Sequence, residues 1–97
     1  MAGQNVPILR KITRHYGLQN SSGILIVTMD DKGPAWSAGL REGDIIYSFA
    51  GEKVEGIDEL HRLLTEEWVD NSAQVCVIRG THRLDMEVTP REREFVN

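Results

Sequence analysis

The chain has 97 residues, of which 40% are hydrophobic and 27% are charged, and its net charge is −4. A chain of this length folds as one domain that buries roughly 60 to 65% of its unfolded surface, so we expect one modest core and no second, catalytic domain. The acidic balance argues against nucleic acid as a partner, because phosphate backbones bind to basic faces.

Two further classes of protein are disfavoured by the same sequence. The longest apolar run, residues 24–29, is far shorter than the roughly 20 residues that span a bilayer, and the N-terminus lacks the pattern of a signal peptide. Cys76 is the single cysteine, so an internal disulfide is excluded. We expect a globular domain without a membrane segment, and its cell compartment stays open.

The N-terminal third predicts a helix followed by a strand. Apolar residues recur at helical spacing through residues 7–16, with Pro7 at the start and Gly17 at the end. Residues 23–29 are continuously apolar and predict a buried strand. Polar and glycine residues between the two predict a turn.

Residues 33–46 read Gly-Pro-Ala-Trp-Ser-Ala-Gly-Leu-Arg-Glu-Gly-Asp-Ile-Ile, the most informative run of the chain. Pro34 favours the first position of a helix, and Gly39 ends that helix after one or two turns. The β-branched and aromatic residues of 45–49 predict a strand, and residues 50–52 predict a turn. The run therefore predicts a short helix between two strands.

Residues 56–67 predict the most secure helix, because acidic residues occupy its first turn and apolar residues recur along it. Its apolar residues form two stripes. One stripe contains Ile57, His61 and Leu64, and the adjacent stripe contains Leu60 and Leu63.

The C-terminal part predicts a hairpin. Residues 74–79 and 83–88 alternate between apolar and polar side chains, and residues 80–82 predict the turn between them. The domain is expected to span residues 1–92, with residues 93–97 as a frayed, charged tail.

The run at residues 33–46, together with the following Gly-x-x-Val turn, resembles the PDZ domains of HtrA-like serine proteases, and the resemblance extends from about Met1 to about Glu92. The matching positions are Pro34, Ala35, Ala38, Gly39, Leu40, Gly43, Asp44, Ile46, Gly51 and Val54. The sequence departs from the family at Gly33, where Ser is usual, and at Trp36, where a small residue is usual. The resemblance implies an α+β fold, a small partly open β-barrel or sandwich of five to six strands capped by two to three helices.

The same resemblance implies peptide binding by β-strand addition, in which an extended peptide pairs with a free strand edge beside a helix. The implied partners are protein C-termini or unfolded, extended segments, together with a protease domain in the parent protein. If the parent protein is a typical HtrA-like protease, the resemblance implies that it lies in the periplasm or cell envelope. No cofactor is implied, and this chain would be a non-catalytic fragment of a serine endopeptidase.

The resemblance also places the binding groove. Met1-Ala2-Gly3-Gln4 matches the end of the family's carboxylate-binding loop, and residues 2–6 would form the groove strand opposite the Ile57 stripe. The expected peptide-binding residues are Met1, Ala2, Gly3, Gln4, Asn5, Val6, Ile57, His61 and Leu64. A rival match for the loop at residues 15–18 leaves too few residues for a groove strand and a turn before residue 23.

Catalytic and metal sites are weakly indicated. Ser37 approaches a Gly-x-Ser-x-Gly elbow but lacks the first glycine and the large sheet that presents such a serine. One cysteine and three dispersed histidines do not give the spacing of a zinc site. We therefore expect no catalytic and no metal-binding residues. An assembly domain, with its groove occupied in cis or by a neighbouring subunit, is the alternative function.

Overall fold

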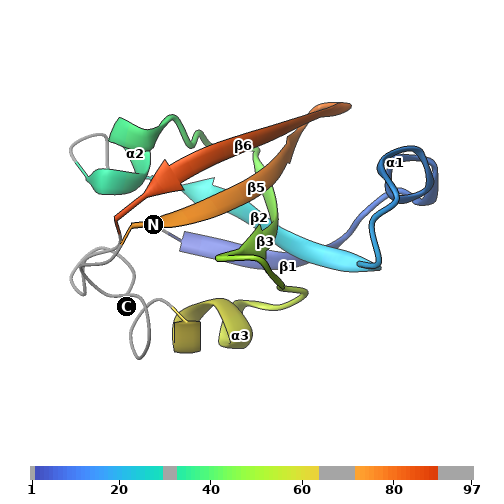
Figure 1. Ribbon diagram of the computed structural model, residues 1–97, viewed down its shortest axis with the longest axis horizontal. Coiled ribbons are helices and arrows are strands. Elements are labelled where there is room, and N and C mark those ends of the chain that lie inside the picture. Colours follow the sequence, from blue (N-terminus) through green and yellow to red (C-terminus); the bar gives the residue numbers. More distant parts are fainter. Residues whose placement is uncertain (1, 30–32, 64–71, 90–97) are drawn as a thin grey trace.

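The computed structural model describes residues 2–29, 33–63 and 72–89 (Figure 1). The elements, in chain order, are β1 (Ala2–Pro7), α1 (Arg10–Tyr16), β2 (Ser22–Thr28), α2 (Pro34–Ala38), β3 (Ile45–Phe49), β4 (Glu52–Lys53), α3 (Ile57–Arg62), β5 (Ala73–Arg79) and β6 (His82–Val88). Helices and strands of mixed order confirm the expected α+β class.

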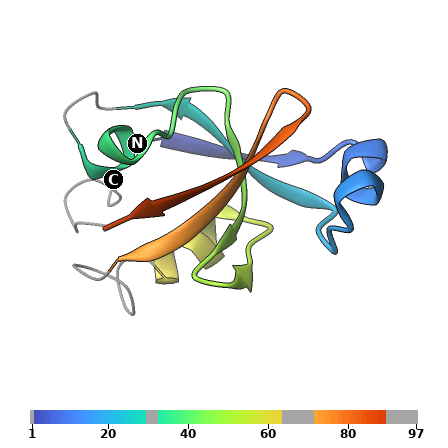
Figure 2. The same ribbon diagram turned by 45° about the horizontal axis from the view of Figure 1, so that its top comes forward.

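The strands form one antiparallel sheet in the order β1-β2-β3-β5-β6, and the short β4 pairs with β3. The sheet twists so strongly that β5 and β6 cross the direction of β1 and β2 (Figure 2). α2 packs against β6 and α3 packs against β1, whereas α1 lies at the far end of the molecule (Figure 1). This arrangement is the six-stranded sheet with three helices that the resemblance implied.

The core has two parts. The main cluster lies between the twisted sheet and the helices α2 and α3, and its largest buried side chains are Phe49, Ile24, Ile26, Leu40, Leu60 and Leu63. A smaller cluster of Ile8, Ile12, Tyr47 and Ile78 attaches α1 to the sheet. Burial, helped by the neighbouring Cys76, raises the pKa of Tyr47 to about 12, so its hydroxyl stays neutral.

The run at residues 33–46 folds around a buried carboxylate. Asp44 is 1% exposed, accepts the backbone N–H of Arg41 at 2.9 Å, and holds the Arg79 guanidinium at 2.7 and 2.8 Å. This pairing with Asp44 raises the pKa of Arg79. The two flanking glycines have φ of 110° at Gly39 and 94° at Gly43, a backbone conformation that side chains disfavour. Gly39, Gly43 and Asp44 of the motif therefore each have a structural cause.

Trp36, the departure from the family pattern inside this run, is half-buried on α2. The Arg41 guanidinium lies over the indole, 3.6 Å from the ring centroid, and also donates to the Trp36 carbonyl at 2.9 Å. The bulky side chain is therefore accommodated at the surface by a cation–π contact.

Several element boundaries differ from the expectations: β2 spans Ser22–Thr28 instead of 23–29, β5 begins at Ala73 instead of residue 74, and Glu52 belongs to β4 instead of a turn. α1 begins at Arg10 rather than Pro7, because residues 2–7 continue as a strand paired with β2. His82 belongs to β6 rather than to the turn, since it pairs with Arg79. The long helix is described as Ile57–Arg62, and the expected continuation over residues 64–67 lies outside the described residues, as does the expected frayed tail.

Candidate functional site

The strand β1 lies at one edge of the sheet, and within the described residues it pairs with β2 alone. Gly3 lies opposite Ile26 and Asn5 lies opposite Ile24. The other side of β1 is bordered by α3 (Figure 1). An edge strand beside a helix is the geometry in which an extended segment could be added to the sheet.

The hydrogen bonds show which backbone groups of β1 point away from β2. The Ile8 N–H donates to the Ser21 carbonyl at 3.0 Å, which extends the β1–β2 ladder by one hydrogen-bonded pair. Because such pairs alternate in an antiparallel ladder, Gln4 and Val6 bond to β2, whereas the backbone N–H and C=O groups of Gly3 and Asn5 point to the outer edge.

The opposite strand supports this assignment independently. The Ile26 N–H donates to the Asp44 carbonyl at 2.9 Å, and the Ile26 carbonyl accepts the Gly43 N–H at 2.9 Å. Both groups of Ile26 are thus used on the side away from β1, as required if Gly3 and Ile26 form a non-hydrogen-bonded pair. Pro7, which has no N–H, occupies the next outward position after Asn5, where no bond to β2 is lost.

Side chains also connect β1 to the start of α3. Asn5 Oδ1 accepts the Ile57 N–H at 2.9 Å, so it satisfies one of the N–H groups that the first turn of a helix leaves without an intrahelical partner. A Cβ added at Gly3 would lie 2.7 Å from Ile24 Cγ2 and 3.3 Å from Ile57 Cδ1. Gly3, Asn5 and Ile57 are therefore held together, and Gly3 has no room for a side chain.

The match to a family model decides the identity of this fold. The model described as PDZ domain matches residues 9–89. The chain belongs to the PDZ domain family.

The curated relatives of this PDZ domain are serine proteases. Serine protease HTRA1 of Xenopus laevis is 38% identical over 77 residues, which are 79% of this chain and 16% of the relative. The probable periplasmic serine endoprotease DegP-like of Rickettsia conorii is 29% identical over 77 residues, which are 79% of this chain and 15% of the relative. The chain thus spans about one sixth of the length of these relatives.

Solved structures give the same fold. The PDZ domain of HtrA3, bound to a phage-derived ligand, matches with a TM-score of 0.68 at 22% identity, covering 94% of this chain and 83% of that chain. The HtrA-type protease AlgW, with a decapeptide, matches with a TM-score of 0.67 at 16% identity, covering 90% of this chain and 27% of that chain. The recognition of an HtrA-like PDZ domain from the motif is confirmed.

The structure places the expected groove residues as follows. Gly3, Asn5 and Ile57 come together at the outer edge of β1. Within the same strand Ala2 and Gln4 are exposed and Val6 is half-buried, while His61 is half-buried on α3. Met1 and Leu64 lie outside the described residues. A role for any of these residues in peptide binding stays a prediction.

The two stripes of α3 differ in burial as expected. Leu60 and Leu63 are each 1% exposed and belong to the main core. Ile57 and His61 are half-buried and lie on the other stripe. The helix therefore has one stripe for the core and one more accessible stripe.

The rival loop at residues 15–18 is a helix terminus. Gly17 caps α1 with φ of 66°, and its N–H donates to the Arg14 carbonyl at 3.4 Å. The next N–H, of Leu18, donates to the Thr13 carbonyl at 2.8 Å. Because these N–H groups close the end of α1, they do not form a carboxylate-binding loop, and the prediction of Gly17 as a helix cap is confirmed.

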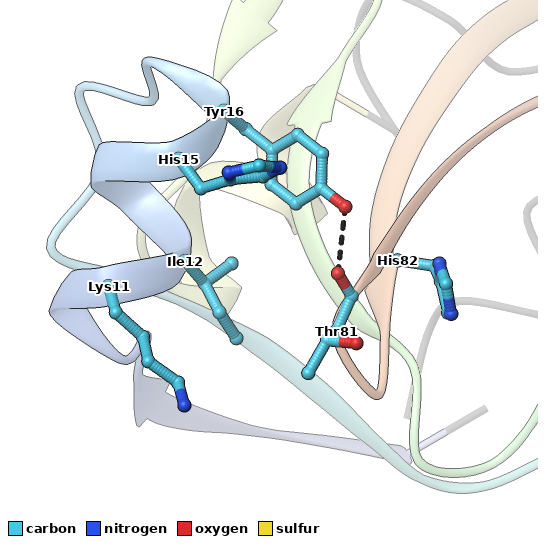
Figure 3. Close-up of a pocket in the computed structure, with 6 residues that line it drawn as sticks. All are labelled: Lys11, Ile12, His15, Tyr16, Thr81 and His82. Carbon is cyan, nitrogen blue, oxygen red and sulfur yellow. Dashed lines mark hydrogen bonds between the residues drawn. The ribbon is translucent and has the colours of Figure 1, made fainter.

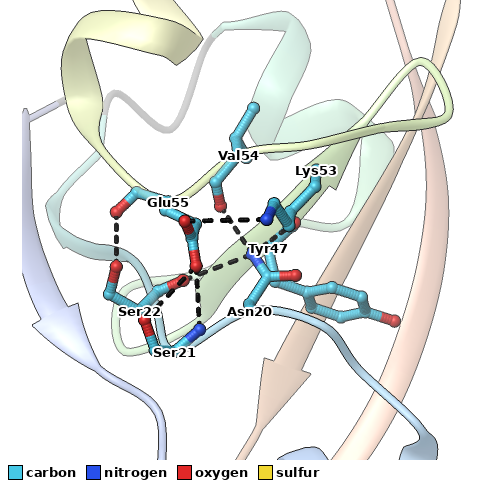
Figure 4. A network of polar contacts seen from close by, with 7 residues as sticks. All are labelled: Asn20, Ser21, Ser22, Tyr47, Lys53, Val54 and Glu55. Atoms are coloured by element: carbon cyan, nitrogen blue, oxygen red, sulfur yellow. Dashed lines mark hydrogen bonds and ion pairs between the residues drawn. The ribbon is translucent and has the colours of Figure 1, made fainter.

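A polar network that sequence reasoning missed fixes the linker before α3 (Figure 4). Asn20 is 7% exposed, and its Nδ2 donates to the carbonyls of Tyr47 at 3.0 Å and Val54 at 2.8 Å. Ser22 Oγ donates to the Glu55 carbonyl at 2.9 Å. These bonds tie the start of β2 to the segment that leads into α3, and so they help to set the distance between α3 and β1.

Glu55 completes this network from its side chain (Figure 4). Its Oε1 accepts the Ser21 N–H at 2.8 Å, and its Oε2 lies 3.8 Å from Lys53 Nζ. The hydrogen bond from the Ser21 backbone, followed by the charge of Lys53, lowers the pKa of Glu55. The carboxylate form is therefore the one that holds the linker.

The described residues offer little for catalysis, metals or membranes. Ser37 is exposed on α2, and Cys76 is half-buried with a pKa raised by burial and by Asp85. Among the described residues, no three His, Cys, Asp or Glu side chains gather where they could hold a metal ion. Within the same ranges, no helix is both long enough and apolar enough to cross a bilayer.

Proposed function

We propose that this PDZ domain binds protein C-termini or extended peptide segments as an additional strand on β1, with α3 as the wall of the groove. The observation that carries the proposal is the outward direction of the Gly3 and Asn5 backbone groups beside Ile57. An added strand could form hydrogen bonds with these two N–H and two C=O groups, which have the spacing of a β-ladder. Such main-chain bonds would supply affinity that does not depend on the side chains of the peptide.

Similar domains support this proposal. The matching HtrA3 domain is bound to a phage-derived ligand, FGRWV, and the matching AlgW protease is seen with a decapeptide. The curated relatives are serine proteases of which this chain covers about one sixth. We therefore propose that the domain serves an HtrA-like serine protease by recognising its substrates, and that the chain itself hydrolyses nothing.

The first experiment measures binding of C-terminal peptides to the 97-residue chain by fluorescence polarisation. The peptide FGRWV and a library of C-terminal pentapeptides are each made as the free acid and as the C-terminal amide. We expect saturable binding that favours the free acid, because the residues around Met1-Ala2-Gly3 match the family's carboxylate loop. Absence of binding by every free-acid peptide would contradict the proposal. Equal binding of acids and amides would indicate that the domain recognises internal, extended segments and not C-termini.

A pair of variants tests whether the peptide pairs with β1. Asn5→Pro removes an outward N–H, and the strand already tolerates a proline at the equivalent position of residue 7. The matched control Asn5→Ala removes the same side chain but keeps the N–H. We expect about tenfold weaker peptide binding for Asn5→Pro than for Asn5→Ala, the effect of one lost hydrogen bond. Equal affinities in two folded variants would exclude pairing at residue 5.

The exposed edge of β1 also makes self-association a second candidate function, because an open edge can pair with the same edge of another copy. This assembly hypothesis predicts a sedimentation coefficient that rises with concentration and falls to that of a monomer in Asn5→Pro. A monomer at all concentrations, measured by analytical ultracentrifugation, would leave peptide binding as the role of this edge.

A further inference from the structure

A hollow of the surface lies beside α1, at the end of the molecule where that helix projects (Figure 1). It is a cavity of about 550 Å³ between α1 and the turn that joins β5 to β6 (Figure 3). Its lining residues are Lys11, Ile12, His15, Tyr16, Thr81 and His82. The volume falls within the range of pockets that hold organic ligands, and it greatly exceeds the space that an inorganic ion needs.

The walls of this cavity are held in place by specific contacts (Figure 3). The Tyr16 hydroxyl donates to the Thr81 carbonyl at 2.7 Å, a bond that links α1 to a turn 65 residues later in the chain. The His15 ring meets the Tyr16 ring edge to face, with the ring centroids 4.7 Å apart. Ile12 is 7% exposed and belongs to the smaller core cluster. The cavity is therefore part of the folded structure of this end of the domain.

The charge of the lining is of one sign. Lys11 is cationic, the imidazoles of His15 and His82 offer N–H donors, and no described lining residue is acidic. The imbalance extends beyond the cavity, because α1 carries Arg10, Lys11 and Arg14 and no acidic residue. On a chain of net charge −4, this end is therefore a local basic surface.

The lining also has an apolar and aromatic part. Ile12 and the ring of Tyr16 lie on the α1 side, next to Lys11 and His15 of the same helix (Figure 3). A ligand that suits both parts carries a carboxylate beside an apolar or aromatic group. Segments that combine Asp or Glu with Phe, Leu or Tyr have this chemistry.

We propose that the cavity is a second binding site, which takes an acidic peptide segment of a partner protein. Its several carboxylates would contact Lys11, His15 and His82 separately, and a neighbouring apolar side chain would lie against Ile12 and Tyr16. Such a site is separate from the β1 edge, so the domain could hold two protein segments at once.

The test uses the 97-residue chain and the labelled peptide GDEFDEG, with GNQFNQG as its uncharged match. Binding is measured by fluorescence polarisation and mapped by amide chemical shifts. We expect saturable binding of GDEFDEG, at least about tenfold weaker binding of GNQFNQG, and shifts confined to residues 11–16 and 80–82. Failure of GDEFDEG to bind, or shifts centred on β1, would overturn the proposal.

Two helix variants separate a specific site from a general attraction. Lys11→Glu reverses a charge that lines the cavity, whereas Arg14→Glu makes the same change at an exposed position of α1 that does not line it. We expect about tenfold weaker binding of GDEFDEG for Lys11→Glu and no more than about a twofold change for Arg14→Glu. Equal losses would show long-range attraction only and would contradict a site.

Two further measurements distinguish an acidic peptide from phosphate and from nucleic acid as the ligand. Sodium phosphate is expected to compete with GDEFDEG weakly, through ionic strength alone, and full displacement by phosphate would indicate an anion site instead of a peptide site. A short single-stranded oligonucleotide with the same number of charges is expected not to bind. Preference for the oligonucleotide over GDEFDEG would overturn the choice of an acidic peptide.

Discussion

The run at residues 33–46 and the strand β1 are organised in opposite ways. In the run, local structure accounts for several motif residues, with Gly39 and Gly43 at positive φ and Asp44 buried under Arg79. β1 carries no comparable pattern, since most of its side chains are exposed and its place depends on pairing with β2 and on the bond from Asn5 to Ile57.

This difference explains why the candidate binding site lies at β1 and not in the run at residues 33–46, although the run is the most recognisable part of the sequence. The run closes the fold on itself, because the Asp44 carboxylate, the Arg41 N–H and the Gly39 carbonyl are engaged in internal hydrogen bonds. β1 instead leaves backbone groups at an edge, where another chain can reach them. Mutations should therefore act on stability in the run and on partner binding at β1.

The largest loss of stability is expected for Asp44→Ala. It leaves the Arg41 N–H and the Arg79 guanidinium without their acceptor, and the cost is moderated because the Arg79 side chain is 43% exposed to water. We expect the free energy of unfolding, measured by urea denaturation, to fall by about 3 kcal/mol. The control Glu42→Ala, at an exposed position of the same run, should change it by less than about 0.5 kcal/mol. Similar values for both would contradict the role assigned to the buried carboxylate.

An intermediate loss is expected for Asn20→Ala, which tests the network between the two regions. The buried carbonyls of Tyr47 and Val54 would lose their donor, so the free energy of unfolding should fall by about 2 kcal/mol. Gln19→Ala, one residue earlier and exposed, is the matched control and should be nearly neutral. A neutral Asn20→Ala would mean that the linker before α3 is held by other contacts.

A smaller effect is expected for Asn5→Ala in β1. Because Asn5 is exposed, loss of its bond to the Ile57 N–H should lower the free energy of unfolding by no more than about 1 kcal/mol. The Ile57 amide should nevertheless exchange its hydrogen faster, which NMR detects at that residue. The control is Gln4→Ala. The Gln4 side chain lies on the other face of the strand from Asn5, so this change should leave the exchange rate of the Ile57 amide unaltered. An unaltered rate in Asn5→Ala would show that β1 does not anchor α3.

The smallest effect is expected for Glu55→Gln, and it depends on pH. The folded protein lowers the pKa of Glu55 below its ordinary value of 4.5, so its carboxylate stabilises the fold above that pH and loses this contribution as the pH falls through the lowered pKa. Urea denaturation at neutral pH should show the variant to be slightly less stable. The difference between variant and parent should shrink in acid, and a constant difference would contradict the role of the charge.

Most of the fold could be predicted from the sequence because its elements are locally marked. The short helix Pro34–Ala38 begins at a proline and ends at a glycine, and the strand Ile45–Phe49 was expected with the same bounds. The stripes of α3 were also separable, since spacing alone distinguishes the buried Leu60 from the more accessible His61. Local signals of this kind survive because the tertiary structure agrees with them.

The candidate site could be predicted only in part. A helix was expected from Pro7, whereas residue 7 ends β1, because its missing N–H is tolerated at the outward edge of a strand. The roles of Asn5, Asn20 and Glu55 gave no signal in the sequence, since each bonds to a backbone group 27 to 52 residues away. The cavity at α1 was likewise unforeseen, because it forms through the packing of a helix on a distant turn.

By itself, the sequence determined the family, the order of most elements and the division of α3 into two stripes, because glycine conformations, proline and apolar spacing act within a few residues. Only the tertiary structure decided which backbone groups of β1 face outward, how α3 is tied to that edge, and that a basic cavity forms beside α1. These features depend on strand register and on contacts between distant segments, for which short-range patterns carry no information.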